Sequence, residues 1–201
     1  MPDPAPRTRH RLPVLATAVV LAAVAMMVWL GFWQIRRLHE KEALLARFAE
    51  ARAQIAEVDW PAQWPTDPDK GYELTYRRAQ LMCSAVTERS SMAGHNAAGE
   101  SGMAQTARCA LPGGGFALVV MGWSQSPMAG TAWQGGEVHG MIAPGQRLVA
   151  DPPLAGLQPN ALPDPADLPN NHLSYAIQWF AFAAMALAIY ALALRKRWEK
   201  G

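Results

Sequence analysis

Charged residues and cysteines are both scarce in this sequence, and their scarcity limits the classes of function that the protein can have. The 18 Lys and Arg residues nearly balance the 16 Asp and Glu residues, and no basic stripe gathers on any segment, so nothing indicates binding to nucleic acid. No nucleophile stands beside a recognisable base, and the sequence has neither a phosphate-binding loop nor a convincing pair of carboxylates. We therefore do not expect an enzyme.

Charged side chains are missing altogether from two long apolar runs, residues 13–35 and 173–194. At about 1.5 Å per residue, each run covers the roughly 30 Å of a membrane's hydrocarbon core. The sequence therefore predicts two transmembrane helices, at residues 13–35 and 169–194, with a long loop between them. A cleaved signal peptide is the alternative for the first run, with Ala23-Val24-Ala25 as its cleavage site.

The basic residues beside the second run predict the orientation of the chain. Four Lys and Arg residues follow this run, whereas only Asp164 and Asp167 lie close before it. Since cytoplasmic flanks carry the excess of Lys and Arg, residues 1–12 and 195–201 are predicted to be cytoplasmic. The loop would then be periplasmic, with the protein in a bacterial inner membrane, or would lie on the equivalent side of a mitochondrial membrane.

Residues 36–58 keep a helical spacing of apolar side chains among charged ones, which is typical of an amphipathic helix. We predict that this segment extends the first transmembrane helix as a stalk. The pairs Trp60-Pro61 and Trp64-Pro65 then end it, because proline restricts the residue before it and donates no backbone hydrogen bond.

Short strand-like segments follow at residues 72–82, 116–123, 137–142 and 147–149, separated by clusters of Gly and Pro. They predict that residues 59–168 form a small antiparallel β-rich domain, resembling a partly closed barrel, on the extracytoplasmic side. Residues 151–169 are rich in proline and are expected to return the chain to the membrane as an extended linker. The predicted fold class is a membrane α+β protein, with two transmembrane helices flanking this domain.

Cys83 and Cys109 are the only cysteines, and both fall on the side that is predicted to be oxidising. A disulfide that closes the loop between them, residues 84–108, is the leading interpretation, because this loop lacks the pattern of a core. Copper binding is a second interpretation, since soft ligands lie near the cysteines: Met82, Met92, Met103, Met121 and His95. The two thiols nevertheless lack the close C-x-x-C spacing of a preformed metal site, and free thiols are the third interpretation.

Polar and basic residues lie at the outer end of the first apolar run. Gln34, Arg37 and Lys41 are spaced i, i+3 and i+7, so a continuous helix places them on one face just above the hydrocarbon. Such a face can bind the carboxylates of an amphipathic ligand. The alternative is that Trp33 belongs to an interfacial aromatic belt and that the cations bind lipid phosphates.

A histidine stands at the start of the second run, after two asparagines that can cap a helix. His172 then lies in the first turn, where the helix dipole disfavours imidazolium, and a neutral imidazole is a competent metal ligand. Tyr175 and Trp179 are expected to line the same face. The alternative is a histidine bonded to lipid headgroups. His39 is either a second ligand or a solvated stalk residue, and His139 falls in a predicted strand without signs of chemistry.

Two segments of the chain resemble signature sequences of a known family. The runs LGFWQIRRLHEKEALL and NNHLSYAIQWFAFA are similar to the two signature segments of the Surfeit locus protein 1 family of cytochrome oxidase assembly factors. The matching residues are Gly31, Trp33, Gln34, Arg37 and Lys41 in the first segment, and Asn170, Asn171, His172, Tyr175 and Trp179 in the second. Tyr76-Arg77-Arg78 also resembles the family's first domain strand.

The resemblance implies a function in the biogenesis of haem-copper terminal oxidases. Family members assist the insertion of haem a into subunit I, so haem a is the expected cofactor, bound at the outer face of the membrane. By resemblance, His172 would lie at the haem iron. The rest of the site would comprise Gln34, Tyr175, Trp179, Arg37 and Lys41, with the haem propionates near Arg37 or Lys41.

The same resemblance names the expected partners. They are subunit I of the oxidase and its assembly intermediates, haem A synthase, and the membrane lipids, with no nucleic acid among them. The alternative hypothesis is a resident accessory subunit of the oxidase complex, whose alanine-rich second helix packs closely on subunit I.

Overall fold

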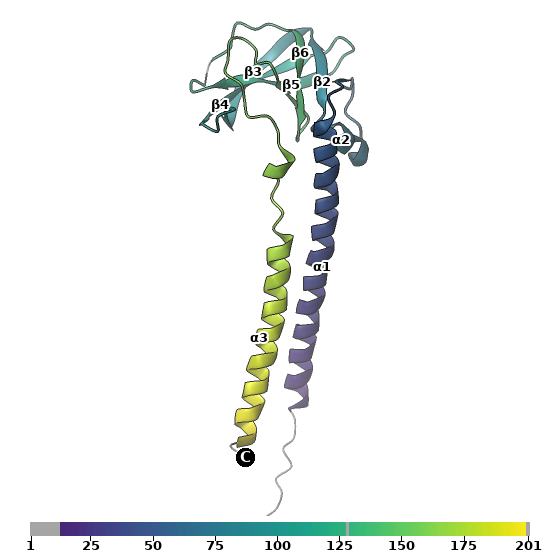
Figure 1. The fold of residues 1–201 in the computed structure, drawn as a ribbon, viewed down its shortest axis with the longest axis vertical. Coiled ribbons are helices and arrows are strands. Elements are labelled where there is room, and N and C mark those ends of the chain that lie inside the picture. Colours follow the sequence, from purple (N-terminus) through teal and green to yellow (C-terminus); the bar gives the residue numbers. More distant parts are fainter. Residues whose placement is uncertain (1–12, 128, 200–201) are drawn as a thin grey trace, which may run out of the picture. The chain divides into compact units, whose positions relative to one another are not determined.

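A computed structural model describes residues 13–127 and 129–199, and it divides into two compact units (Figure 1). The helix pair comprises residues 13–42 and 169–199, and the β domain comprises Ala43–Leu168. The predicted N-terminal segment, residues 1–12, lies outside the described residues, as do the last two residues of the predicted C-terminal segment.

Two long helices account for the apolar runs. Helix α1 spans Val14–Ala53 without a break, and α3 spans His172–Glu199. Both are long and apolar enough to cross a membrane. The first apolar run and the stalk are thus one helix, but α1 ends at Ala53 instead of residue 58. The reason is that Val58–Asp59 form strand β1, which pairs with the sheet of the β domain.

Within the helix pair, α1 and α3 run antiparallel and contact each other at three levels. The hydroxyls of Thr17 and Tyr190 are hydrogen-bonded at one level. At the second level, the ring of Phe180 packs against Gly31. The same ring lies edge-on to that of Phe32, and the centroids of these two rings are 5.4 Å apart. At the third, Gln34 meets His172. The buried residues of α3 are small, Ala176 and Ala183, as expected where helices approach closely in a membrane.

The β domain contains one seven-stranded sheet, in the order β1-β2-β6-β7-β5-β4-β3. After β1, the strands are β2 Arg78–Cys83, β3 Ala85–His95, β4 Ser101–Ala110, β5 Phe116–Ser124, β6 Gly136–Ala143 and β7 Arg147–Ala150. The pairs β1–β2 and β5–β7 are parallel, and the other neighbours are antiparallel. The prediction of a purely antiparallel sheet was therefore wrong: β7 forms a hairpin with β6 and consequently runs parallel to β5 on its other side.

The sheet is also open. Among the described strands, β1 and β3 are the two edges and no ladder joins them, so the expected partial closure into a barrel is not observed. Covalent links nevertheless join the two halves of the sheet. Strand β2, the neighbour of the β1 edge, continues into the β3 edge through Ser84 alone, and the disulfide between Cys83 and Cys109 joins β2 to β4.

Two segments differ from their predicted structures. The strand predicted from residue 72 begins only at Arg78, because the residues before it form helix α2, Pro68–Leu74, which Asp67 caps by accepting a hydrogen bond from the Asp69 N–H. The stretch between the cysteines is no loop, since β3 and β4 pair along it as a long hairpin.

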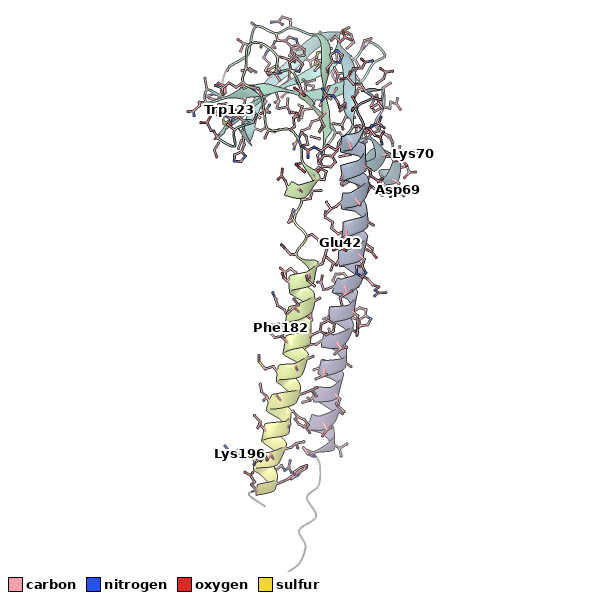
Figure 2. All side chains as sticks on the ribbon, in the orientation of Figure 1. Glu42, Asp69, Lys70, Trp123, Phe182 and Lys196 are labelled. Carbon is pink, nitrogen blue, oxygen red and sulfur yellow. A yellow bond between two sulfur atoms is a disulfide. The ribbon has the colours of Figure 1, made fainter. Side chains whose placement is uncertain are left out.

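The main core of the domain lies on one face of the sheet. The largest fully buried side chain of the domain is Trp123 (Figure 2), which is 2% exposed and whose Nε1–H donates to the Gly94 carbonyl (3.4 Å). The return segment, residues 151–169, is not a free linker. It bonds to β5 through Gln158 and Trp123, and to the hairpin through Ala161 and His95, so it belongs to the domain up to Leu168.

The last turns of α1 also belong to the β domain. Phe48 is 5% exposed, and its ring lies 5.0 Å from that of Tyr76 and 5.8 Å from that of Tyr72. Arg52 forms an ion pair with Asp164 at the start of the short 3-10 helix η1, Pro165–Asp167. These contacts fix the end of α1 to the sheet.

Candidate functional site

The candidate site lies in the helix pair, where the two signature segments meet. His172 is the first residue of α3, and the first backbone bond of that helix runs from the Tyr175 N–H to the Asn171 carbonyl (3.2 Å). The Nδ1 atom of His172 lies 2.7 Å from Oε1 of Gln34 on α1. Both side chains are half-buried. Residues 138 positions apart in the sequence are thus brought into hydrogen-bond contact.

A glycine makes this contact possible. Gly31 lies one helical turn before Gln34, and a Cβ at this position would be 2.7 Å from Cε1 and Cζ of Phe180. Real Cβ atoms do not come so close to a ring, so only glycine allows the helices to approach as they do. Sequence reasoning missed Phe180, because one aromatic residue among many in an apolar run carries no special signal.

The two cations of the first segment differ in their surroundings. The Arg37 guanidinium forms an ion pair with Glu40 (2.7 Å) and lies 5.8 Å from the centroid of the Trp33 ring. Its side chain is 53% exposed. Lys41 is half-buried and has no ion-pair partner among the described residues. Of the two, Lys41 is therefore the cation with an uncommitted charge.

The aromatic residues of α3 differ in how far they are buried. His172 and Phe180 contact α1, whereas Tyr175 is 51% exposed. Trp179 is half-buried and forms an edge-on pair with Phe182, with ring centroids 6.3 Å apart. Tyr175 and Trp179 thus flank the seam between the helices, and their exposed surfaces are available to a lipid or a ligand.

Two alternative metal sites receive no support from the geometry. The sulfur atoms of Cys83 and Cys109 are bonded to each other and both residues are buried, which leaves no thiolate for copper. His39 is exposed on α1. Within residues 13–127 and 129–199, no group of three or more His, Cys, Asp or Glu side chains is arranged to hold a metal ion.

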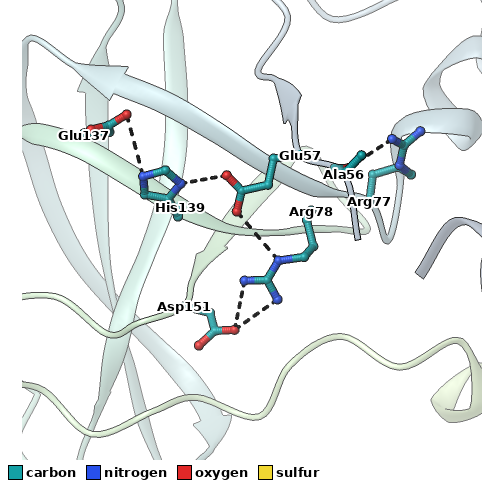
Figure 3. A network of polar contacts seen from close by, with 7 residues as sticks. All are labelled: Ala56, Glu57, Arg77, Arg78, Glu137, His139 and Asp151. Atoms are coloured by element: carbon teal, nitrogen blue, oxygen red, sulfur yellow. Dashed lines mark hydrogen bonds and ion pairs between the residues drawn. The ribbon is translucent and has the colours of Figure 1, made fainter. Parts of the chain in front are cut away.

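The β domain has a polar network that sequence reasoning did not foresee (Figure 3). The Glu57 carboxylate lies 2.8 Å from Nδ1 of His139 and 3.7 Å from Nε of Arg78. Arg78 also reaches Asp151 (3.4 Å), and Glu137 lies 3.7 Å from the other ring nitrogen of His139. The network joins β2 and β6 to the segments before β1 and after β7, so its evident role is to hold them together.

A cleft of about 390 Å³ opens in the β domain between the sheet and the return segment. Its lining includes the apolar Val120, Val149 and Leu162 and the buried Tyr76, and its more exposed polar rim includes Arg147 and Asp167. Burial raises the pKa of the Tyr76 phenol, as do the carboxylates of Asp164 and Asp167, while Arg52 opposes them. The size suits a small molecule, but the mixed charges of the rim indicate no ligand class.

Two antiparallel apolar helices with a histidine–amide contact, separated in the sequence by a mixed β domain, indicate a membrane protein with two spans. A sequence model of the SURF1 family matches residues 21–184. The chain therefore belongs to the SURF1 family, which is a cytochrome oxidase assembly family and not a class of enzymes. This confirms the resemblance of the two signature segments. A comparison with curated proteins gives no match.

Proposed function

We propose that this protein assists the assembly of a haem-copper terminal oxidase by holding haem a at the outer membrane face and passing it to subunit I. The observation that supports this proposal best is the contact between Gln34 and His172. It joins the two segments by which the chain resembles its family, and it does so at the ends of both apolar runs.

The residues at this contact have the chemistry that haem requires. Haem iron is commonly held by a histidine nitrogen, and Nε2 of His172 has no hydrogen-bond partner among the described residues. Exposed aromatic surface lies beside it on Tyr175 and Trp179. Haem is the cargo here, and it supplies the redox-active iron of the client oxidase. A single histidine at an open seam suits a carrier that must release its cargo.

The proposed orientation places both termini in the cytoplasm and the β domain in the periplasm of a bacterial inner membrane. Antiparallel helices with the observed contacts require both termini to lie on the same side if both helices cross the membrane. A phosphatase fused after Glu100, in the turn between β3 and β4, should be active, and a fusion at Gly201 should be inactive. The reverse pattern would contradict the orientation and the haem site at the outer face.

The absorption spectrum of the purified full-length protein tests the function. We expect haem to be retained when the host makes haem a and lost when it does not. His172→Ala should lower haem occupancy and shift the Soret band, whereas His39→Ala, at an exposed position on α1, should leave both unchanged. Equal haem content in the wild type and His172→Ala would refute the assignment and favour the resident accessory subunit, which co-purifies in a fixed ratio with active oxidase.

The different surroundings of Lys41 and Arg37 predict which of the two contributes more to haem binding. Lys41→Ala should weaken haem binding by about 1 kcal/mol, because a partly solvated contact to a propionate is screened. Arg37→Ala should have a smaller effect, since its charge is already paired with Glu40. A larger loss for Arg37→Ala than for Lys41→Ala would place the propionates near Arg37 instead.

A further inference from the structure

We infer that Gln34 is a positioning residue: it holds His172 in the tautomer protonated on Nδ1, so that Nε2 presents its lone pair to the ligand. The use of this lone pair by haem rests on the proposed function. The tautomer itself is a property of the chain without any ligand and can be tested separately.

The inference starts from the atoms in contact. Oε1 of Gln34 lies 2.7 Å from Nδ1 of His172. An amide oxygen can only accept a hydrogen bond, so the Nδ1–H must donate. A neutral imidazole carries one proton on its two ring nitrogens. The other nitrogen, Nε2, is then unprotonated, and this is the form that can bind a metal.

The geometry favours this contact over any other for the histidine. Gln34 cannot move far, because Gly31 and Phe180 pack together one turn away on the same pair of helices. Both members of the bond are half-buried, where water competes less for their polar groups. The other amide within the apolar runs, Gln178, is exposed on α3 and has no side-chain hydrogen bond to any residue that the structure describes. Of these two amides, Gln34 is the one placed to select the tautomer.

The consequence for binding follows from the behaviour of metal-bound histidines. Such residues almost always donate their second ring N–H to an acceptor, which fixes the tautomer and the ring orientation. Loss of the acceptor lowers metal affinity by about 10-fold to 100-fold. The sequence predicted that Gln34 contacts the ligand. In this inference, Gln34 instead positions His172 and does not touch the haem.

Nitrogen NMR of the ligand-free, full-length protein in detergent tests the tautomer directly. The ring nitrogens of His172 are identified by comparison with the spectrum of His172→Ala, with both spectra recorded at mildly alkaline pH. We expect the wild type to be protonated on Nδ1. Gln34→Met, which keeps the length of the side chain but accepts poorly, should yield a mixture of tautomers. Gln34→Glu, which still accepts, should keep the Nδ1–H form, and the matched control Gln178→Met should leave the spectrum unchanged.

A second readout measures binding of ferric haem b as the probe. Gln34→Met should lower its affinity by about tenfold, as for loss of a supporting acceptor. Gln34→Glu should rescue the affinity because its carboxylate still accepts from the Nδ1–H, and the control Gln178→Met should bind as the wild type does. Near-ultraviolet circular dichroism of each variant verifies that the β domain remains folded.

The outcomes separate this inference from the proposed function. A wild-type His172 protonated on Nε2 would overturn the inference, because the amide would then be donating. An unchanged tautomer in Gln34→Met, or loss of the Nδ1–H form in Gln34→Glu, would also overturn it. If the tautomer responds as expected but neither the wild type nor any variant binds haem, the selection by Gln34 stands and the haem-carrier function fails.

Discussion

The ring of Phe180 on α3 lies so close to Gly31 on α1 that no side chain fits between them. A Cβ at residue 31 would be 2.7 Å from two ring carbons and 3.0 Å from a third. The hydrogen bond between Gln34 and His172 lies one helical turn further along. The close packing and the hydrogen bond are therefore parts of one interface. A substitution that disturbs the packing of Gly31 and Phe180 should also disturb the bond between Gln34 and His172.

The first prediction concerns this coupling. Gly31→Ala should push the helices apart near Phe180, weaken the bond between Gln34 and His172, and lower haem affinity by up to about tenfold, as for loss of a supporting contact. Phe180→Leu in the same chain should restore much of the affinity, because the smaller side chain makes room for the added methyl group. Titration with ferric haem b measures both effects. Equal affinities for the wild type and Gly31→Ala would show that the packing does not support the site.

The helix pair was largely predictable, for a plain physical reason. An uncharged apolar run of membrane length has few alternatives to a transmembrane helix, and polar residues at the ends of such runs stand out as candidates for a site. It was less predictable which residues of each apolar run face the partner helix. Every residue of an apolar run is compatible with lipid, so nothing in the sequence shows that Phe180 faces the partner helix while Tyr175 lies outside.

The hairpin of β3 and β4 was missed because its strands lack alternation. Strand β3 is an edge strand, and all of its residues are exposed or half-buried. Small residues such as Ser91, Ala93 and Gly94 show no apolar pattern, and pairing with β4 gives them their structure. Residues 58–59 illustrate the same limit: their pairing with β2 is a long-range contact that local spacing cannot reveal.

The second prediction concerns Trp123 and the glycine beneath it. A Cβ at Gly102 would be 2.4 Å from Cζ2 of Trp123 and 2.6 Å from Cε2. The indole is fully buried and cannot move aside, so Gly102→Ala should destabilise the β domain by about 1 to 3 kcal/mol, the usual cost of overpacking a core. Gly113→Ala is the matched control, because a Cβ there meets no atom within 4 Å. Denaturant unfolding followed by tryptophan fluorescence measures the difference, and equal stabilities would contradict the packing.

The third prediction concerns the disulfide between Cys83 and Cys109, which lie 26 residues apart in the chain. Mass spectrometry without reduction should show their two peptides linked. Replacing both residues by Ala should lower the free energy of unfolding of the β domain by roughly 3 to 4 kcal/mol, since the bond limits the freedom of the unfolded chain. Neither residue is exposed, so alkylation should require both reduction and unfolding. Ready alkylation of both thiols in the native protein would show that the bond is absent.

The last prediction concerns the pH dependence of the ion pair between Arg52 and Asp164. The hydrogen bond from the Ala166 N–H lowers the pKa of the Asp164 carboxyl below its ordinary value, as do the bond and charge of Arg52, while partial burial opposes them. A carboxyl whose pKa is lower in the folded state stabilises the fold above its unfolded pKa, and this stabilisation disappears as the pH falls through the folded value. Asp164→Asn keeps an oxygen for the Ala166 N–H but removes the charge, so it should lower stability at neutral pH and make little difference in strong acid.

The expected loss is small, at most about 1 kcal/mol, because both side chains are more than a third exposed and water screens the pair. Arg52→Met should cost a similar amount, and combining it with Asp164→Asn should add little, since either change alone removes the interaction. Glu50→Gln, at an exposed position of α1 without an ion pair among the described residues, should show no such dependence. Denaturant unfolding of the full chain at several pH values measures these differences. A loss for Asp164→Asn that stays constant down to strong acid would mean that the charge of Asp164 is not what stabilises the end of α1 on the β domain.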